Sequence, residues 1–423
     1  MQRKKKEIFP LSKTHFRCLL KSMNLALEKL TFSRAVWYNN TITYREVFME
    51  RYLGQNTPKL GFGLMRLPKL KNGEIDLEQV KRMVDLFMDA GQTYFDTAYV
   101  YDDGKSEEAA RKALVERYDR DKFTLCTKLN AWMGAHDEQS AKQQFFTSLE
   151  RTGAGYFDYY LLHALQPGNY HLYEKYHLWD FVKEQKAKGL IRHWGFSFHA
   201  TPEILEEVLD AHPDTEFVQL QLNYADWESE KVAARKCYEI VRRYGKPIVV
   251  MEPIKGGALA NPQADVAKLL KAAAPERSAA SWAIRYAASL DGIITVLSGM
   301  SNEAQMRDNL SYMRRFEPLS ESEREVIAKA QELLGSAKTI PCTACHYCTP
   351  GCPMNIPIPE IFAARNRQLG AGQLSRGKAD YAAATADGGK AETCIACGQC
   401  ESACPQQLSV IELLADCANA FDR

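Results

Sequence analysis

The 423-residue chain lacks the features that would set it apart from ordinary globular proteins. It has no apolar run of the roughly 18–20 residues that a membrane-spanning helix needs, so we expect no segment to cross a bilayer. It has no excess of one charge, because 54 Lys and Arg residues face 53 Asp and Glu residues. This balance excludes a general attraction to nucleic acid or to a membrane surface. Hydrophobic residues are not scarce either: they make up 46% of the chain, which excludes bulk disorder.

We expect no secretory signal at the start of the chain. Residues 1–48 carry ten Lys and Arg residues against three acids, with no apolar segment of useful length and no small-residue cleavage site. Our hypothesis is that the native protein starts at Met49 and that residues 1–48 are a basic extension outside it. We therefore expect a cytoplasmic protein with two domains, over residues 49–335 and 336–423.

Cysteine is the one residue type in clear excess. Eight of the 12 cysteines lie in two groups after residue 340, each with the spacing C-x₂-C-x₂-C-x₃-C-P. Disulfide frameworks are typical of short secreted chains, so metal ligation is the better interpretation. This spacing is that of bacterial-type [4Fe-4S] ligation, in which the fourth cysteine of each motif binds the other cluster. The predicted ligand sets are Cys342, Cys345, Cys348 and Cys404 for one cluster, and Cys394, Cys397, Cys400 and Cys352 for the other.

Zinc is the alternative for these cysteines, because paired C-x₂-C motifs commonly bind it. Two complete quartets, each followed by a proline, favour iron–sulfur clusters. Residues 370–389, between the two motifs, are rich in Gly, Ala and Ser and predict a connector, with weak helix around 378–386.

From about residue 60 to 315, short apolar runs alternate with segments of helical periodicity. The predicted strands are Leu60–Leu67, Thr93–Ala98, Phe123–Leu129, Phe157–His163, His193–Phe198, Phe217–Asn223, Pro247–Pro253 and Ile293–Met300. The predicted helices are Leu77–Ala90, Glu107–Tyr118, Asp137–Arg151, Trp179–Lys188, Pro202–Ala211, Lys231–Tyr244, Ser278–Ser289 and Glu321–Leu334. Eight such units predict an α/β protein with a (β/α)₈ TIM barrel. The cysteine motifs predict that a small bacterial-ferredoxin-like domain with two clusters follows the barrel. An open doubly wound sheet is the alternative, weakened because no G-x-G-x-x-G follows the first strand.

Reactive side chains follow consecutive predicted strands, where the catalytic groups of such barrels lie. Asp96 and Tyr101 follow the second strand, Lys128 ends the third and His163 ends the fourth. A phenol has a pKa of about 10 and is a poor acid at neutral pH. A neighbouring ammonium would lower that pKa, so we expect Lys128, held by Asp96, to make Tyr101 a proton donor. His163 would orient and polarise a carbonyl, and a nicotinamide would supply the hydride.

These residues resemble the signature of the aldo-keto reductase superfamily. The match consists of Asp-Thr-Ala-x-x-Tyr at 96–101, the strand-end Lys128 and Leu-Leu-His at 161–163, and the resemblance covers residues 51–315. It implies a catalytic tetrad of Asp96, Tyr101, Lys128 and His163, with NAD(P)H extended over the barrel mouth. With the cysteine motifs, the chain from about residue 49 is similar to the branch of this family that carries a fused dicluster ferredoxin domain.

The resemblance also implies a set of cofactor contacts. These are Ser197 and Gln219 at the carboxamide, Met251, Pro253, Gly256 and Gly257 near the nicotinamide and diphosphate, and Ser298, Gly299, Met300, Gln305 and Asn309 toward the adenosine. Two positions depart from the family. Met251 stands where many members stack an aromatic ring on the nicotinamide, and Gln305 stands where NADPH-preferring members often carry Arg. The choice between NADH and NADPH therefore stays open.

The sequence thus predicts a cytoplasmic NAD(P)-dependent oxidoreductase that reduces a carbonyl to an alcohol, or the reverse, linked to two [4Fe-4S] clusters. The expected partners are a small carbonyl or alcohol substrate and an electron-transfer protein or flavoprotein, without nucleic acid or membrane. Whether the clusters exchange electrons with the nicotinamide, serve a partner or are structural is left open. The alternative function is an iron–sulfur electron-transfer or redox-sensing protein that uses the barrel as a non-catalytic scaffold.

Overall fold

A computed structural model describes residues 53–335, 339–371 and 374–422. The basic extension 1–48, the proposed start at Met49 and Cys18 lie outside the described residues. Within the described ranges, no helix combines the length and the apolar character needed to cross a membrane.

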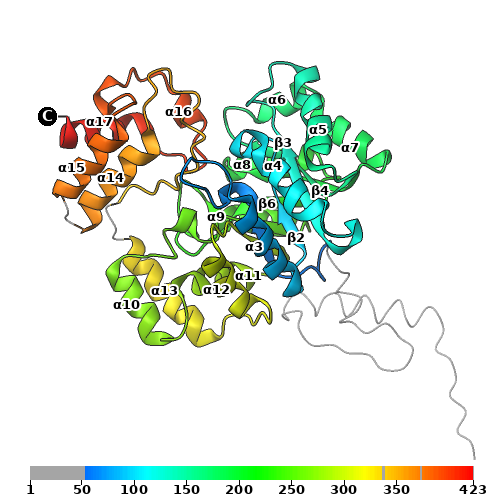
Figure 1. Cartoon of the computed structure of the whole chain (residues 1–423), viewed down its shortest axis with the longest axis horizontal. Coiled ribbons are helices and arrows are strands. Elements are labelled where there is room, and N and C mark those ends of the chain that lie inside the picture. The colour runs from blue at the N-terminus through cyan, green and yellow to red at the C-terminus, as the bar shows by residue number, and fades with distance from the viewer. Residues whose placement is uncertain (1–52, 336–338, 372–373, 423) are drawn as a thin grey trace, which may run out of the picture. The chain divides into compact units, whose positions relative to one another are not determined.

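Eight parallel strands form a closed barrel in chain order, with β1 hydrogen-bonded to both β2 and β8. Figure 1 labels β2, β3, β4 and β6 of this barrel. The strands are β1 Leu60–Gly63, β2 Tyr94–Asp96, β3 Thr124–Leu129, β4 Phe157–Leu165, β5 Ile191–Phe198, β6 Phe217–Gln221, β7 Ile248–Met251 and β8 Ile293–Ser298. The predicted TIM barrel is therefore confirmed, and the open sheet is excluded. Each predicted strand lies on an observed one, although several are shorter because their last residues turn into the loops at the barrel mouth.

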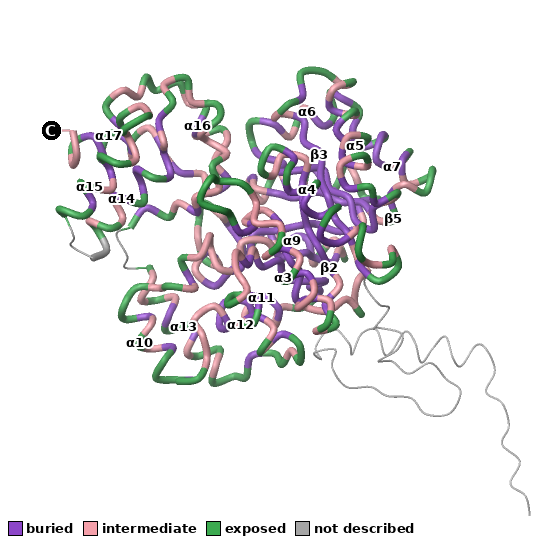
Figure 2. Tube along the Cα trace, viewed as in Figure 1, coloured by how far each residue is buried: buried purple, intermediate pink, exposed green. Residues whose placement is uncertain are grey.

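The strands are buried on both faces, which is why they appear in the sequence as continuous apolar runs. All nine residues of β4 are buried, and the purple trace in Figure 2 is concentrated on the barrel strands. Neighbouring side chains alternate between two cores. Tyr94 points into the barrel with Tyr159 and Phe217, whereas Phe95 packs toward the helices with Phe87. The barrel is thus a packed body that holds its strand ends rigidly.

Most predicted helices are observed within one to three residues of their expected ends. The helices and helical turns of the barrel region are α3 Leu77–Asp89, α4 Lys105–Ala110, α5 Glu138–Thr152, α6 Tyr170–Lys175, α7 Leu178–Ala187, α8 Pro202–Ala211, α9 Ala234–Arg243, α10 Ala264–Ala273, α11 Ala279–Ala288, α12 Glu303–Met313 and α13 Glu321–Gly335. Local signals explain the sharp starts: Asp137 and Ser140 form a capping box at α5, and Thr201 caps α8 ahead of Pro202.

Two helix predictions need correction. The segment predicted as one helix over 107–118 is α4 followed by a π-helical turn over Arg111–Val115. The helices α6, α10 and α12 were missed. The helix α6 has only six residues, and α12 buries the polar Asn309 between Met306 and Met313, which weakens its apolar stripe. The helix α10 buries Val266 and Leu270, a helical spacing that was visible in the sequence.

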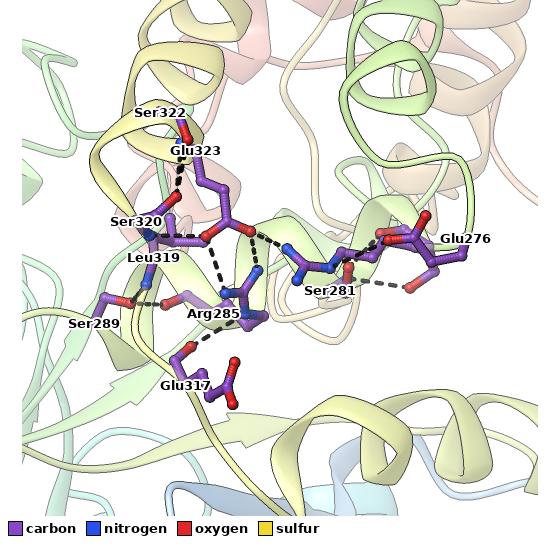
Figure 3. Close-up of polar contacts among 11 residues, drawn as sticks. Glu276, Ser281, Arg285, Ser289, Glu317, Leu319, Ser320, Ser322 and Glu323 are labelled. Atoms are coloured by element: carbon purple, nitrogen blue, oxygen red, sulfur yellow. Dashed lines mark hydrogen bonds and ion pairs between the residues drawn. The ribbon is translucent and has the colours of Figure 1, made fainter.

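A partly buried ion network fixes α13 to α11 at the edge of the barrel region (Figure 3). Arg285 Nη1 and Nη2 donate to the two carboxylate oxygens of Glu323 at 2.6 and 3.1 Å, and Arg277 pairs with the same carboxylate. Glu323 also accepts the backbone N–H of Ser320 at 2.8 Å, just before the helix. Bidentate pairing of this kind fixes geometry as well as charge.

The C-terminal segment has its own small core. It contains α14 Ile358–Ala371, α15 Leu374–Ala384, α16 Gln399–Ser402 and α17 Val410–Phe421. The weak helix expected around 378–386 within the connector 370–389 is observed as α15, which starts earlier, at Leu374, and packs against α14. Gly377 permits the close approach: a Cβ there would lie 2.9 Å from the carbonyl oxygen of Ala364. Burial of Ile361 and Phe362 against Leu414 completes this core.

Candidate active site

The ends of β2 and β3 place a buried ion pair at the barrel mouth. Lys128 Nζ donates to Asp96 Oδ1 at 2.5 Å and to the carbonyl oxygen of Thr97 at 2.6 Å. Both charged side chains are almost fully buried, with 0% and 4% of their side-chain surface exposed. Two rigid parallel strands hold them, and Gln219 Nε2 donates to the second oxygen of Asp96 at 3.3 Å from β6. The carboxylate therefore fixes the lysine in one position.

Tyr101 and His163 lie against this pair. Tyr101 begins the short 3₁₀ turn Tyr101–Gly104, and Lys128 Nζ lies 4.9 Å from the centroid of its ring. The rings of Tyr101 and His163 meet edge to face with 5.7 Å between centroids. The structure therefore brings together all four residues of the predicted tetrad, from three consecutive strands and a following turn.

A strand irregularity orients His163. The pairing of β4 with β5 shifts register between Leu162 and Leu165, and Ala164 has a φ of 55°. The N–H of Ala164 donates to Ser197 Oγ at 2.7 Å, and the Tyr173 hydroxyl donates to the carbonyl oxygen of His163. Bulges of this kind re-aim side chains next to active sites. Ser197 was expected at the cofactor carboxamide, but in this structure its hydroxyl oxygen accepts the N–H of Ala164 in the bulge.

Burial sets the protonation of the site. It raises the pKa of Tyr101 well above the usual value, and the nearby Asp96 carboxylate acts in the same direction. The expectation that Lys128 lowers this pKa is therefore not met: the ammonium is bound to Asp96 and Thr97, and desolvation of the phenolate dominates. Burial, with Lys128 and His199 nearby, lowers the pKa of His163 well below its usual value. At neutral pH, Tyr101 carries its proton and His163 is uncharged.

A cavity of about 530 Å³ extends from these side chains across the ends of β7 and β8, and we call it the mouth cavity. It is lined by Asp96, Tyr101 and His163 but not by Lys128, which lies beneath them. Of the predicted cofactor residues, all except Ser197 line it, namely Gln219, Met251, Pro253, Gly256, Gly257, Ser298, Gly299, Met300, Gln305 and Asn309. Its elongated lining, from the tetrad to α12, fits an extended dinucleotide.

Glu252 and Arg66 are among the residues of this cavity that were missed from the sequence. Glu252 follows Met251 directly and has a φ of 54°; its Oε2 accepts the N–H of Gly256 at 2.6 Å and so shapes the turn after β7. Burial raises the pKa of Glu252, while Arg66 opposes that shift. An acid between an apolar strand and a proline was a visible signal. The sequence carries no such signal for Arg66, because Thr343, whose carbonyl oxygen accepts from it, is remote in sequence.

The cysteine-rich segment closes part of the mouth cavity. Arg66 Nη2 donates to the carbonyl oxygen of Thr343 at 2.6 Å, and Gln221 and Gln406 exchange two amide hydrogen bonds at 3.0 Å. Thr343, Cys345, Tyr347 and Pro405 line the cavity from this side. The hydroxyl of Tyr347 lies 3.5 Å from His163 Nε2. Sequence reasoning missed Tyr347, since 184 residues separate it from the histidine.

The eight clustered cysteines line two separate small cavities of the C-terminal segment. One is lined by Cys342, Cys345, Cys348 and Cys404, and the other by Cys352, Cys394, Cys397 and Cys400. These are the two predicted sets, with the fourth cysteine of each motif exchanged. Four thiols around each space are the donor set that a [4Fe-4S] cluster takes. Among the described residues, no three His, Cys, Asp or Glu side chains form a group suited to a single metal ion.

Comparison with known proteins identifies the family. The model of the aldo/keto reductase family matches residues 59–332, and that of the 4Fe-4S dicluster domain matches residues 341–408. The chain therefore belongs to the aldo/keto reductase family, and it carries a C-terminal 4Fe-4S dicluster domain. It is an oxidoreductase of that family.

Curated relatives and solved structures agree with this placement. The aldo-keto reductase str7 of Strobilurus tenacellus is 31% identical over 222 residues, a match to 49% of this chain and 62% of that protein. The uncharacterized oxidoreductase YqkF of Bacillus subtilis is 22% identical and is matched over 86% of its length and 60% of this chain. The holo form of aldo-keto reductase AKR11C1 from Bacillus halodurans superposes with a TM-score of 0.53 at 25% identity, covering 64% of this chain and 91% of that one.

The fold is also that of an aldo-keto reductase from Klebsiella pneumoniae solved in complex with NADPH. The TM-score is 0.52 at 20% identity, over 67% of this chain and 93% of that chain. The part of the chain beyond residue 340 is matched by the dicluster-domain model.

Proposed function

We propose that this protein is an NAD(P)H-dependent carbonyl reductase, or an alcohol dehydrogenase in the reverse direction, that uses Asp96, Tyr101, Lys128 and His163. The observation that carries the proposal is their convergence at one end of an elongated cavity. Each has a mundane explanation when taken alone, but a buried ion pair beneath a phenol and an imidazole at a barrel mouth is the arrangement of a proton-transfer site.

Each residue has a distinct part in this reaction. Tyr101 holds its proton up to high pH and donates it to the oxygen of the carbonyl as that oxygen gains negative charge. His163, uncharged, offers a hydrogen bond that orients the carbonyl without competing for the proton. Lys128 places a positive charge under the phenol ring, and Asp96 fixes that charge. The nicotinamide, when bound, supplies the hydride.

The residues at the far end of the cavity favour NADH over NADPH. Asp308 and Gln305 of α12 line this end, and Asp308 Oδ2 accepts the Ser278 hydroxyl at 2.7 Å. A carboxylate here would repel the 2′-phosphate of NADPH, and Arg307 is exposed and pairs with Glu303 instead. The side-chain amide of Asn309 donates to the Ser298 hydroxyl and accepts from the Tyr312 hydroxyl, so Asn309 acts as a structural support at this end.

We propose that the two cysteine sets bind two [4Fe-4S] clusters that transfer electrons. Cys345 lines the mouth cavity, so a cluster on the first set would adjoin a cofactor bound there, whereas Cys397 of the second set is exposed. The exposed cysteine suits exchange of single electrons between the clusters and an electron-transfer protein or flavoprotein at the surface. A nicotinamide gives up two electrons together as a hydride, whereas each cluster carries one, so electrons would pass between the nicotinamide and the clusters only through a flavin that divides the pair. The reducing conditions that such clusters need fit the cytoplasm.

The test is a Tyr101→Phe variant of the anaerobically purified, cluster-loaded protein. We expect NADH oxidation with an aldehyde to fall at least 100-fold, because the proton donor is removed while the ring is kept. Tyr238→Phe, which removes a hydroxyl that donates to the Asp291 carbonyl at the barrel surface, is the control and should retain full activity.

Full activity in Tyr101→Phe would refute the tetrad. If the wild-type chain reduces no carbonyl yet its clusters exchange electrons with a ferredoxin-type partner, the barrel is a scaffold and the alternative function holds. A broad visible absorption band that bleaches on reduction distinguishes iron–sulfur clusters from zinc at the cysteines.

A further inference from the structure

A second cavity, of about 520 Å³, adjoins the active site. We call it the interdomain cavity, because two parts of the chain line it. The loops after β3 and β4, over residues 132–134 and 166–169, form one side. The cluster-binding loops, over residues 347–351 and 397–403, form the other. Tyr347 lines both this cavity and the mouth cavity, so the two meet at its ring.

Aromatic rings lead from the interdomain cavity to the catalytic histidine. Trp132 and Tyr347 meet edge to face with 5.9 Å between centroids, and Tyr347 and His163 do so at 6.2 Å. The Tyr347 hydroxyl lies beside His163 Nε2. Tyr347 itself stands between Cys345 and Cys348, so the loop that surrounds the first cysteine cavity also sets its position.

The polar side chains of the interdomain cavity include two buried hydrogen-bond donors. Among the described residues that line it, none is Asp, Glu, Lys, Arg or His, and the exposed Cys397 belongs to the second cysteine set. Two buried donors there have no hydrogen-bond partner: Gln166 Nε2, on a side chain that is 2% exposed, and Trp132 Nε1. Leaving a buried donor unpaired costs about 1–3 kcal/mol, so water or a bound ligand is expected to accept from these two groups. An anion would find no basic side chain to pair with here, and the thiolates of the second cluster, when bound, would repel it.

We propose that the interdomain cavity binds the body of the substrate, and that the iron–sulfur domain is one wall of the substrate site. The substrate is an uncharged aromatic carbonyl compound with a neutral oxygen that accepts from Gln166 and Trp132. Its ring packs between Trp132 and the cluster loops, and its carbonyl lies past Tyr347, next to His163 and Tyr101. Tyr347 is a positioning residue. This inference rests on the proposed function and adds the substrate class.

The first test compares two aldehydes of similar shape, 4-methoxybenzaldehyde and the anionic 4-carboxybenzaldehyde. With the cluster-loaded wild-type protein we expect kcat/KM to favour the uncharged compound at least 100-fold. Gln399→Lys adds a positive charge to the cavity wall and should narrow that ratio at least 10-fold. Ala382→Lys, on an exposed face of α15, is the matched control and should leave the ratio unchanged. Equal use of the two aldehydes by the wild type would overturn the proposal.

The second test measures binding without turnover. Calorimetric titration with 4-methoxybenzyl alcohol should show at least a 10-fold weaker affinity in Tyr347→Ala and in Gln166→Leu. Tyr347→Phe, which keeps the ring, should bind within about 3-fold of wild type. Ala382→Lys, on the exposed face of α15, is again the control and should bind the alcohol like wild type. Cluster absorbance is recorded for each variant to show that the loop is intact.

The two tests distinguish the two proposals. If the alcohol binds in this cavity but no aldehyde is reduced, the proposed function fails and the site stands. If acetaldehyde, which is too small to reach the interdomain cavity, is reduced in a Tyr101-dependent way while Tyr347→Ala and Gln166→Leu bind the benzyl alcohol like wild type, the function stands and this inference is wrong.

Discussion

The barrel and the dicluster domain achieve order by different means. The barrel buries continuous strands such as β4 on both faces and places its polar groups on their ends. The dicluster domain has a small core around Ile361 and Leu414, and its cysteines surround two further spaces. A segment of this size rarely holds itself together by apolar burial alone. The barrel therefore fixes its site by packing, whereas we expect the dicluster domain to fix Tyr347 through its clusters.

The largest expected effect tests the barrel half of this comparison. Lys128→Met removes the ammonium from under Tyr101 and leaves the buried Asp96 carboxylate without its partner. Breaking such a pair destabilises a protein by about 3–5 kcal/mol, and we expect carbonyl reduction to fall at least 1000-fold. Assays of carbonyl reduction and of thermal unfolding measure the loss of activity and the loss of stability in Lys128→Met. The exposed Lys122→Met is the control in both assays. Near wild-type turnover would contradict the role of the pair.

The second prediction separates the two domains. Cys345→Ser should prevent assembly of the first cluster and loosen residues 339–422, while the barrel stays folded. Limited proteolysis, followed by mass spectrometry, should cut the dicluster domain at least 10-fold faster and leave an intact barrel fragment. Simultaneous loss of both domains would show that packing between them, rather than the cluster, holds the C-terminal segment.

The third prediction concerns the edge of the barrel drawn in Figure 3. Glu323→Gln leaves Arg277 and Arg285 with a neutral partner. Because Glu323 is partly exposed, we expect a loss of about 2 kcal/mol, below the full value for a buried pair. The midpoint of thermal unfolding measures it. Glu325→Gln, an exposed position on the same helix, should leave the midpoint within about 1 °C.

The smallest expected effect concerns pH: we expect the rate of carbonyl reduction not to change with pH in the neutral range. Because burial raises the pKa of Tyr101 and lowers that of His163, the phenol stays protonated and the imidazole neutral across the neutral range. The pKa of Tyr101 lies above about 10 and that of His163 below about 6.5, so neither side chain titrates between these two values. We therefore expect kcat/KM for carbonyl reduction to be flat from about pH 7 to 9. Alcohol oxidation needs the phenolate and should rise with pH over the same interval. A sigmoidal loss of reduction centred near pH 8 would mean that Lys128 does lower the pKa of Tyr101.

Much of the molecule was predictable because its signals are local. Apolar runs such as 157–163 predicted the strands, and the order of eight units predicted the barrel. The positions of Asp96, Lys128 and His163 at strand ends predicted that they meet, since parallel strands bring their carboxyl ends to one rim. The helix α12 escaped prediction because the polar Asn309 lies between Met306 and Met313 on its buried side and weakens the periodic pattern.

The sequence by itself determined the class of protein, the cysteine spacing and the side chains at the strand ends, because each depends on residues that are close along the chain. Only the tertiary structure decided that Tyr347 joins the active site, that Ser197 holds the bulge beside His163, and that burial outweighs Lys128 in setting the pKa of Tyr101. Those three features depend on contacts between distant segments and on how much water the folded chain excludes, and neither quantity is written in a local pattern.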